Sequence, residues 1–183
     1  MRIIALVNQK GGVGKTTSVL NIGAGLARMR KNVLLVDMDP QANLTEGCGI
    51  DPDSVEKSIY DVLMGELSIA DVDVNIGSGI NLAPSNIDLS GAEAKLLQLP
   101  VKDMRLKRAL DQITSPDYIL IDCPPSLGQL TLNALTAAQE IFIPLQTEFY
   151  ALKGMKKLLT TVSMVQEWSN CERYCGHDVK PTL

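Results

Sequence analysis

Short, mostly continuous runs of apolar residues recur along the chain, and longer polar segments separate them. Five of these runs predict strands: RIIALV (2–7), NVLLVD (32–37), INLAPS (80–85), YILIDC (118–123) and EIFIPL (140–145). A strand that is covered on both faces needs apolar side chains on both faces, so continuous runs favour parallel strands buried between helical layers over alternating, half-exposed strands.

The segments between these runs show helical periodicity. They predict helices over 15–30, 56–65, 88–98, 103–113, 128–138 and 150–167. Repeated alternation of strand and helix predicts right-handed crossovers, and therefore an α/β fold with a mostly parallel β-sheet and helices on both faces. Ligands of such sheets bind at the carboxyl ends of the strands.

The last predicted helix has one apolar face, and its periodicity stops after Trp168. The apolar residues on that face are Leu152, Met155, Leu159 and Val162. We therefore expect one domain over residues 1–167 and an irregular tail over 168–183.

Composition narrows the class of protein. The 183 residues are 45% apolar and 21% charged, the balance of an ordinary globular domain. No run approaches the roughly 18 apolar residues of a membrane span, and the N-terminus lacks a signal-peptide pattern, so a cytoplasmic location is expected. The net charge of −4 gives no overall nucleic-acid footprint, so any such contact requires a local patch or an oligomer.

Cations on two predicted helices offer such patches, although ordinary solvated helix faces have the same composition. They are Lys102, Arg105, Lys107 and Arg108 on one helix and Lys153, Lys156 and Lys157 on the other. The cysteines Cys48, Cys123, Cys171 and Cys175 do not suggest a disulfide framework. Cys171, Cys175 and His177 offer three zinc ligands in a short tract, but a fourth would have to be recruited, and an incidental tail is the alternative.

The segment VNQKGGVGKTT follows the first predicted strand and opens the first predicted helix. Glycines let backbone N–H groups converge on phosphate oxygens, and a helix N-terminus adds its positive dipole. Lys15 is then expected to reach the outer phosphates and Thr16 to coordinate Mg²⁺. The expected nucleotide-binding residues are Lys10, Gly11, Gly12, Val13, Gly14, Lys15, Thr16 and Thr17. The alternative is a chain-reversing turn with a solvated Lys15.

Aspartates follow two other predicted strands. Asp37 and Asp39 end the second strand, and Asp122 ends the fourth, where a Walker B acid reaches the Mg²⁺ shell through a water. A metal-dependent phosphate site needs an acid near the metal and a group that positions the attacking water. Solvated or turn-capping aspartates are the alternative reading of these residues.

The loop departs from the standard phosphate-binding pattern, because Gln9 stands where a glycine is usual and Lys10 follows it. KGGVGKTT resembles the deviant signature of ParA/MinD-class ATPases. DMDPQAN resembles the switch I motif of the ParA family, DCPPSLG its switch II, and PLQTEFYALKG a segment near its dimer interface. Glu148, Phe149 and Tyr150 would pack at that interface or simply in the core.

The resemblance to ParA/Soj-type partitioning ATPases implies a P-loop NTPase-like fold with ATP and Mg²⁺ as cofactors. It implies catalytic roles for three residues: Lys15, Lys10 reaching the phosphates of the other subunit, and Asp39 orienting water. Asp37 would support the metal beside Thr16 and Asp122. The implied partners are a second copy bound in the presence of ATP, DNA without sequence preference and a ParB-type stimulating protein, with the ATP-bound form on the nucleoid.

Members of the family that this chain resembles continue beyond this length, and their further segments supply contacts to the adenine base and much of the basic DNA-binding surface. A nucleotide-binding module without turnover is therefore one alternative. An iron-protein-like reductase would need cluster-binding cysteines at a dimer interface. A MinD-like membrane switch would need a basic amphipathic terminal helix.

Overall fold

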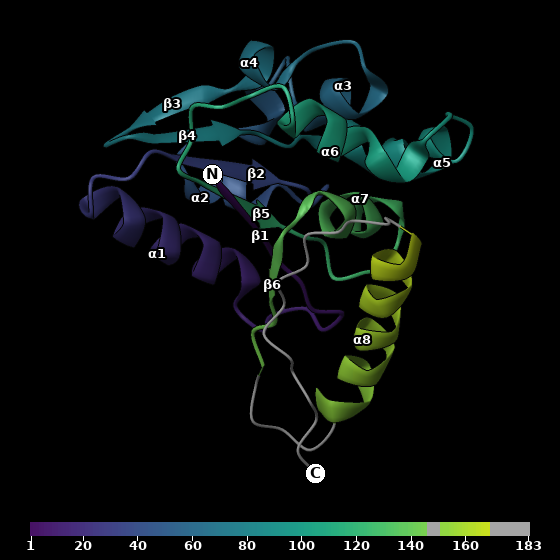
Figure 1. Ribbon diagram of the computed structural model, residues 1–183. Helices are drawn as coiled ribbons and strands as arrows, with labels where there is room; N and C mark the ends of the chain where they lie inside the picture. Colours follow the sequence, from purple (N-terminus) through teal and green to yellow (C-terminus); the bar gives the residue numbers. More distant parts are fainter. Residues whose placement is uncertain (146–150, 169–183) are drawn as a thin grey trace.

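The computed structural model describes residues 1–145 and 151–168, which fold around one six-stranded sheet (Figure 1). The strands are β1 (Arg2–Leu6), β2 (Val33–Asp37), β3 (Val74–Gly77), β4 (Ile80–Ala83), β5 (Tyr118–Asp122) and β6 (Glu140–Phe142). Their order is β3-β4-β2-β5-β1-β6, and every neighbouring pair is parallel except β3 and β4. The predicted α/β fold is confirmed.

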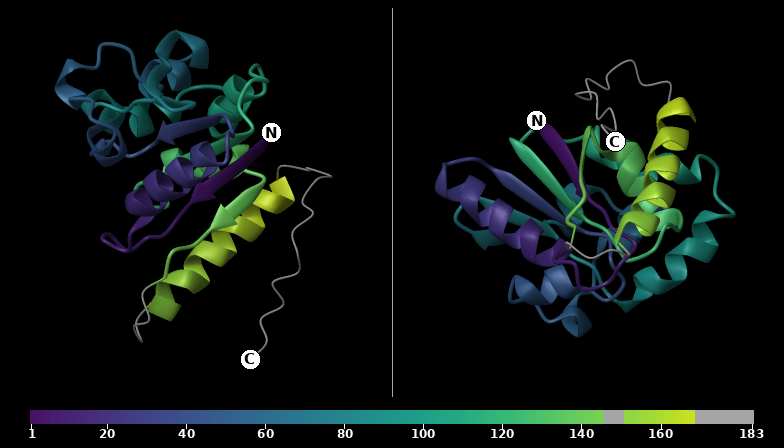
Figure 2. Two further views of the ribbon diagram at one scale, coloured as in Figure 1. Left: turned by 90° about the vertical axis from the view of Figure 1, so that its left-hand side faces the viewer. Right: turned by 90° about the horizontal axis from the view of Figure 1, so that it is seen from below.

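Helices cover both faces of the sheet. The α-helices are α1 (Lys15–Arg28), α2 (Asn43–Gly47), α3 (Ile59–Met64), α4 (Ile69–Val72), α5 (Ala92–Leu96), α6 (Arg105–Leu110), α7 (Gln129–Ala137) and α8 (Ala151–Trp168). Helix α1 lies on one face, and α7 and α8 lie on the other (Figures 1 and 2). Alternate residues of each central strand feed two separate apolar cores, which explains the continuous apolar runs.

The sequence prediction missed the antiparallel edge strand β3. The hairpin turn that joins it to β4 is Gly77-Ser78-Gly79, and all three residues have positive φ. Glycine adopts such angles readily, so this Gly-Ser-Gly between two short runs was the available signal. Short helices α2 and α4 were also missed. Two predicted helices instead begin as 3₁₀ turns, η2 (Ile87–Gly91) and η3 (Lys102–Met104), and a further 3₁₀ turn is η1 (Pro52–Ser54).

The buried side of helix α8 differs slightly from the apolar face read from the sequence. Leu158 and Val165 are buried and Val162 packs against the core, whereas Leu159 is 44% exposed. Leu159 belongs to the apolar face but not to the buried core. The buried stripe follows positions i, i+4 and i+7, one residue round the helix from the expected stripe. Leu152 and Met155 belong to the part of α8 whose side chains are not described.

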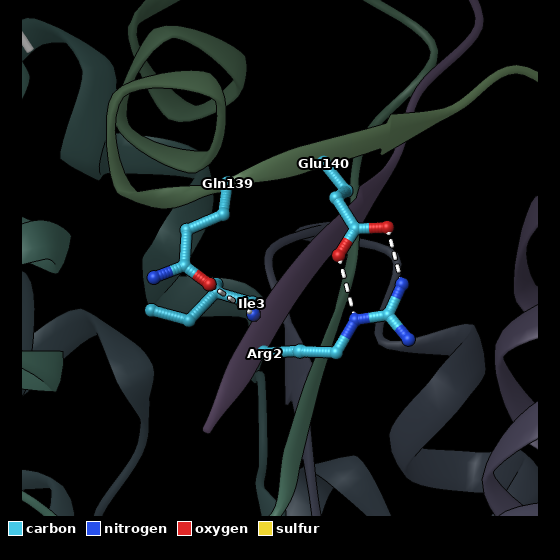
Figure 3. A network of polar contacts seen from close by, with 4 residues as sticks. All are labelled: Arg2, Ile3, Gln139 and Glu140. Atoms are coloured by element: carbon cyan, nitrogen blue, oxygen red, sulfur yellow. Dashed lines mark hydrogen bonds and ion pairs between the residues drawn. The ribbon is translucent and has the colours of Figure 1, made fainter. Parts of the chain in front are cut away.

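Strand β6 is fastened to β1 by side chains as well as by the ladder (Figure 3). The guanidinium of Arg2 donates to both carboxylate oxygens of Glu140, at 2.7 and 2.6 Å. The backbone N–H of Ile3 donates to Gln139 Oε1 at 3.3 Å. Beyond the strands, Asn8 Nδ2 donates to the carbonyl of Pro144 at 2.7 Å. The start of the glycine-rich loop is therefore tied to the end of the neighbouring strand.

Two groups of residues singled out from the sequence lie outside the described part of the chain. They are the segment with Glu148, Phe149 and Tyr150, and the tract with Cys171, Cys175 and His177. Their expected roles stay predictions.

Candidate functional site

Three adjacent parallel strands end at the same edge of the sheet and bring the predicted site residues together. Asp122 pairs in register with Leu6 on one side and with Asp37 on the other. The glycine-rich loop leaves β1 immediately after this register, so it lies beside both carboxylates. The location agrees with the rule that ligands of parallel sheets bind at the carboxyl ends of strands.

The loop has the backbone that an anion-binding turn needs. Gly12 and Gly14 have φ of 70° and 88°, the left-handed region that glycine adopts without strain. An added Cβ would meet nothing within 4 Å at either position, so backbone conformation rather than space selects glycine. Gly14 precedes α1, whose first turn contains no acidic residue and no side-chain cap, so its N-terminal dipole is available to an anion.

The two lysines of the loop occupy different environments. Lys15 begins α1 and is only 7% exposed, at the centre of the site. Lys10 is exposed at the rim, and its backbone N–H donates to Asn8 Oδ1 at 3.0 Å. This difference is compatible with one lysine serving the subunit's own ligand and the other pointing towards a neighbour.

Thr16 and Asp122 form the strongest candidate for a metal site. The Thr16 hydroxyl donates to Asp122 Oδ2 at 2.6 Å. The other carboxylate oxygen, Asp122 Oδ1, is buried and has no hydrogen-bond partner among the residues that the structure describes. A hydroxyl and a carboxylate with one buried oxygen left unpaired offer the hard oxygen ligands that Mg²⁺ prefers, so the residues fit this ion.

Burial changes the pKa of two carboxylates at this edge of the sheet. It raises the pKa of Asp122 to about 7; the hydrogen bond from Thr16 opposes the shift and the nearby Asp37 adds to it. Burial likewise raises the pKa of Asp37 to about 6, against hydrogen bonds from Thr45 and Asp39. Each carboxylate pays a desolvation cost when it ionises, and a bound cation would offset that cost.

Both oxygens of Asp37 are engaged by its own loop. Oδ1 accepts from the N–H of Asp39 at 3.1 Å. Oδ2 accepts from the N–H and the hydroxyl of Thr45 at 2.9 and 2.8 Å. The proposed role of Asp37 near the metal stays a prediction, and these bonds give the residue a structural role as well.

Asp39 follows β2 and is 8% exposed at the same edge. Its Oδ1 accepts from the N–H of Gln41 at 3.0 Å, and its carbonyl accepts from the Ser85 hydroxyl at 2.8 Å. Sequence reasoning missed Thr45 and Ser85. Ser85 was visible as a polar residue at the end of a predicted strand, whereas no local signal pointed to Thr45.

The described cations and cysteines add little to the site. Arg105 donates to the carbonyls of Leu63 and Met64, and Lys107 pairs with Asp111, so part of one possible patch serves local structure. Cys123 is fully buried, and burial raises its pKa well above the usual value, as expected of a packing residue. Among residues 1–145 and 151–168, no group of three or more His, Cys, Asp or Glu side chains gathers as a metal centre.

Comparisons with known proteins agree with this geometry. A family model described as "AAA domain" matches residues 1–172. The sporulation initiation inhibitor protein Soj of Bacillus subtilis is 49% identical over 173 residues, which are 93% of this chain and 68% of Soj. The chromosome partitioning protein ParA of Caulobacter vibrioides is 46% identical over 170 residues, 91% of this chain and 64% of that ParA. This chain therefore spans about two thirds of the length of these relatives.

A solved structure gives the same result for the fold. A Mycobacterium smegmatis protein described as cobyrinic acid a,c-diamide synthase, crystallised with an ATP analogue and magnesium, superposes with a TM-score of 0.89. It is 48% identical, and the match covers 92% of this chain and 70% of that one. With the family model over 1–172 and Soj at 49% identity, the chain belongs to the AAA domain family and, within it, to the ParA/Soj group of P-loop proteins.

Proposed function

We propose that this chain binds ATP with Mg²⁺ and hydrolyses it as a ParA/Soj-type switch. The observation that carries the proposal is the buried, unpartnered Asp122 Oδ1 beside Thr16 and the glycine-rich N-terminus of α1. A buried acceptor without a partner is costly unless a ligand completes it. The ATP analogue and magnesium in the Mycobacterium smegmatis structure support the same ligands here.

Each residue then has a defined task. The backbone N–H groups of residues 11–17 and the Lys15 ammonium bind the phosphates. Thr16 and Asp122 hold Mg²⁺, which neutralises charge that develops on the phosphate oxygens. Asp39 orients the attacking water and accepts its proton. Lys10 supplies a positive charge to the site of a second subunit, as an arginine finger does.

Partitioning of a chromosome or plasmid is the biological role that we propose, because the Caulobacter vibrioides relative is named a chromosome partitioning protein. The proposal includes an ATP-dependent homodimer, a ParB-type partner that stimulates hydrolysis, and DNA bound without sequence preference. Because the chain has a net charge of −4, it would not attract DNA as a whole. We therefore propose that DNA binds to a local basic patch or to a surface formed by the dimer. Cytoplasmic and nucleoid location belong to the same proposal.

The alternatives make different demands on the described residues. A reductase with a cluster at the dimer interface would need accessible cysteines, and Cys123 is fully buried. In the described part of the chain, no helix is long and apolar enough to cross a membrane. Nucleotide binding without turnover is the closest competitor, since it uses the same loop.

Replacing Asp39 by alanine separates binding from turnover. We expect Asp39→Ala to bind a fluorescent ATP analogue within about twofold of wild type while phosphate release falls at least about 100-fold, because the phosphates are held by the loop and not by Asp39. Glu46→Ala, which removes an exposed carboxylate nearby, is the control and should retain full activity. Loss of nucleotide binding in Asp39→Ala would contradict the role of Asp39. No phosphate release from wild type would favour a binding module.

A further inference from the structure

We infer that Thr45 and Ser85 are positioning residues that clamp the backbone of Asp39 for hydrolysis. The inference rests on the proposed function. It concerns two hydroxyls that lie outside the four sequence motifs described above. Both side chains are fully buried, with no exposed surface. They come from different elements, since Thr45 lies in α2 and Ser85 follows β4.

The Thr45 hydroxyl is fixed in both of its hydrogen-bonding roles. It donates to Asp37 Oδ2 at 2.8 Å and accepts from the N–H of Ser85 at 2.9 Å. A hydroxyl with its donor and its acceptor both engaged has one orientation. Thr45 therefore joins the end of β2 to the end of β4, the parallel neighbour of β2 in the sheet.

The two peptide groups of Asp39 are held by the same network. Its N–H donates to Asp37 Oδ1 at 3.1 Å, and its carbonyl accepts from the Ser85 hydroxyl at 2.8 Å. Asp37 is itself held by Thr45 through two bonds. Asp39 thus projects from a backbone that is fixed on both sides, and its Oδ1 is oriented by the N–H of Gln41.

The loop that follows Asp39 is strained, which shows that surrounding contacts hold it. Ala42 adopts φ of 53°, an unfavourable angle for a residue with a Cβ, and is 2% exposed. Its N–H donates to the Asp39 carbonyl at 2.9 Å, the oxygen that Ser85 also contacts. Such a conformation persists only where the structure around it over-determines it. The Thr45–Ser85 pair is positioned to supply that constraint.

The clamp lies apart from the groups that bind phosphate. Thr45 and Ser85 contact Asp37 and Asp39, whereas the glycine-rich loop is built from residues 10–17. A displacement of about 1 Å in a water-orienting group can slow chemistry about 100-fold without weakening substrate binding. Loss of either hydroxyl should therefore act on the hydrolysis rate and spare nucleotide affinity.

The test uses Ser85→Ala, Thr45→Val and the conservative Thr45→Ser. We expect the first two to lower single-turnover hydrolysis at least about tenfold while affinity for a fluorescent ATP analogue stays within about twofold. Thr45→Ser keeps the hydroxyl and should restore most of the rate. The matched control is Ser58→Ala, which removes another fully buried hydroxyl, one that caps α3 and touches neither Asp37 nor Asp39. It should cost stability and leave the rate unchanged.

Hydrogen exchange of the nucleotide-free protein gives a readout that does not depend on turnover. We expect amides of residues 38–46 to exchange faster in Ser85→Ala and Thr45→Val, and amides of α1 to be unaffected. If Thr45→Val fails to fold, Ser85→Ala alone decides.

Unchanged exchange of this loop, or equal losses of rate in Ser85→Ala and Ser58→Ala, would overturn the inference. If wild type does not hydrolyse ATP, the proposed function fails, and the exchange data still decide whether the clamp exists.

Discussion

Burial makes the ionised Asp122 carboxylate unfavourable, so a bound cation would stabilise it. Its Oδ1 has no partner, and its pKa is raised to about 7. Burial also raises the pKa of Asp37, its neighbour in register, to about 6. The two ionised carboxylates at the ends of β2 and β5 therefore destabilise the folded protein, and this destabilisation decreases when magnesium or a proton binds.

The first residue-scale prediction concerns pH. Because the two carboxylates have higher pKa values in the folded protein than the ordinary aspartate value of 3.8, the folded state binds more protons than the unfolded state. Stability should fall as pH rises from about 4.5 to about 8, by about 2–4 kcal/mol in chelator. Urea unfolding across this range checks it, and Asp122→Asn should flatten the curve. A stability that rises over this range would contradict the assignment.

The second residue-scale prediction concerns the strained Ala42. Ala42→Gly should stabilise the protein by about 0.5–1 kcal/mol, since glycine relieves a left-handed angle that costs about 1–2 kcal/mol and offsets part of this gain by its own entropy. The same exchange at Ala24, exposed within α1, should destabilise by about 1 kcal/mol. Denaturation midpoints of the two variants must move in opposite directions for the interpretation to stand.

Helix α3 shows how elements fix one another. Its N-terminus has a capping box, in which Ser58 accepts from the N–H of Tyr60 and Asp61 accepts from the N–H of Ser58. At its C-terminus, Arg105 from α6 donates to the last two carbonyls. Gly65 follows with φ of 82°, so the helix ends where Arg105 closes it.

The element-scale prediction is that this Arg105 cap stabilises the pairing of α3 with α6. Arg105→Ala should lower the free energy of unfolding by about 1–3 kcal/mol, because two helix-end carbonyls lose a charged donor. Arg108→Ala, on the exposed face of the same helix, is the matched control and should change it by less than about 0.5 kcal/mol. Equal effects in urea unfolding would mean that Arg105 acts only as a surface charge.

At the scale of the whole molecule, the site gathers at one edge of the sheet, with Lys15 buried in it and Lys10 exposed at its rim. Both lysines lie within the six-residue stretch 10–15, yet they have different surroundings. This arrangement suits a site that is completed by a second copy of the chain, as proposed above.

The corresponding prediction is a dimer that depends on nucleotide. Light scattering after size-exclusion chromatography should give a dimer with Mg²⁺ and a non-hydrolysable ATP analogue, and a monomer with ADP. Lys10→Ala should bind the analogue normally and dimerise at least about tenfold more weakly, because it removes a charge delivered across the interface. Lys31→Ala, an exposed lysine just before β2, is the control. Unchanged dimerisation of Lys10→Ala would make Lys10 an ordinary surface residue.

The sequence by itself determined five of the six strands, the glycine-rich loop and the order of the carboxylates along the chain. Apolar runs and helical periodicity are local signals, and parallel strands place their carboxyl ends at one edge whatever the details of packing. The meeting of Thr16 with Asp122, 106 residues apart, could therefore be expected from motif order alone.

Only the tertiary structure decided the remaining features. The exposed side of Leu159 depends on how α8 rotates against the core, and periodicity fixes such a rotation only to within a residue. The Thr45 hydroxyl bonds to Asp37 and to the backbone N–H of Ser85, and the Ser85 hydroxyl bonds to the Asp39 carbonyl, across 8 to 46 residues. These bonds depend on the positions of α2 and the end of β4 to within a fraction of an ångström, and hydrogen-bond geometry of that kind leaves no trace in the local pattern of the chain.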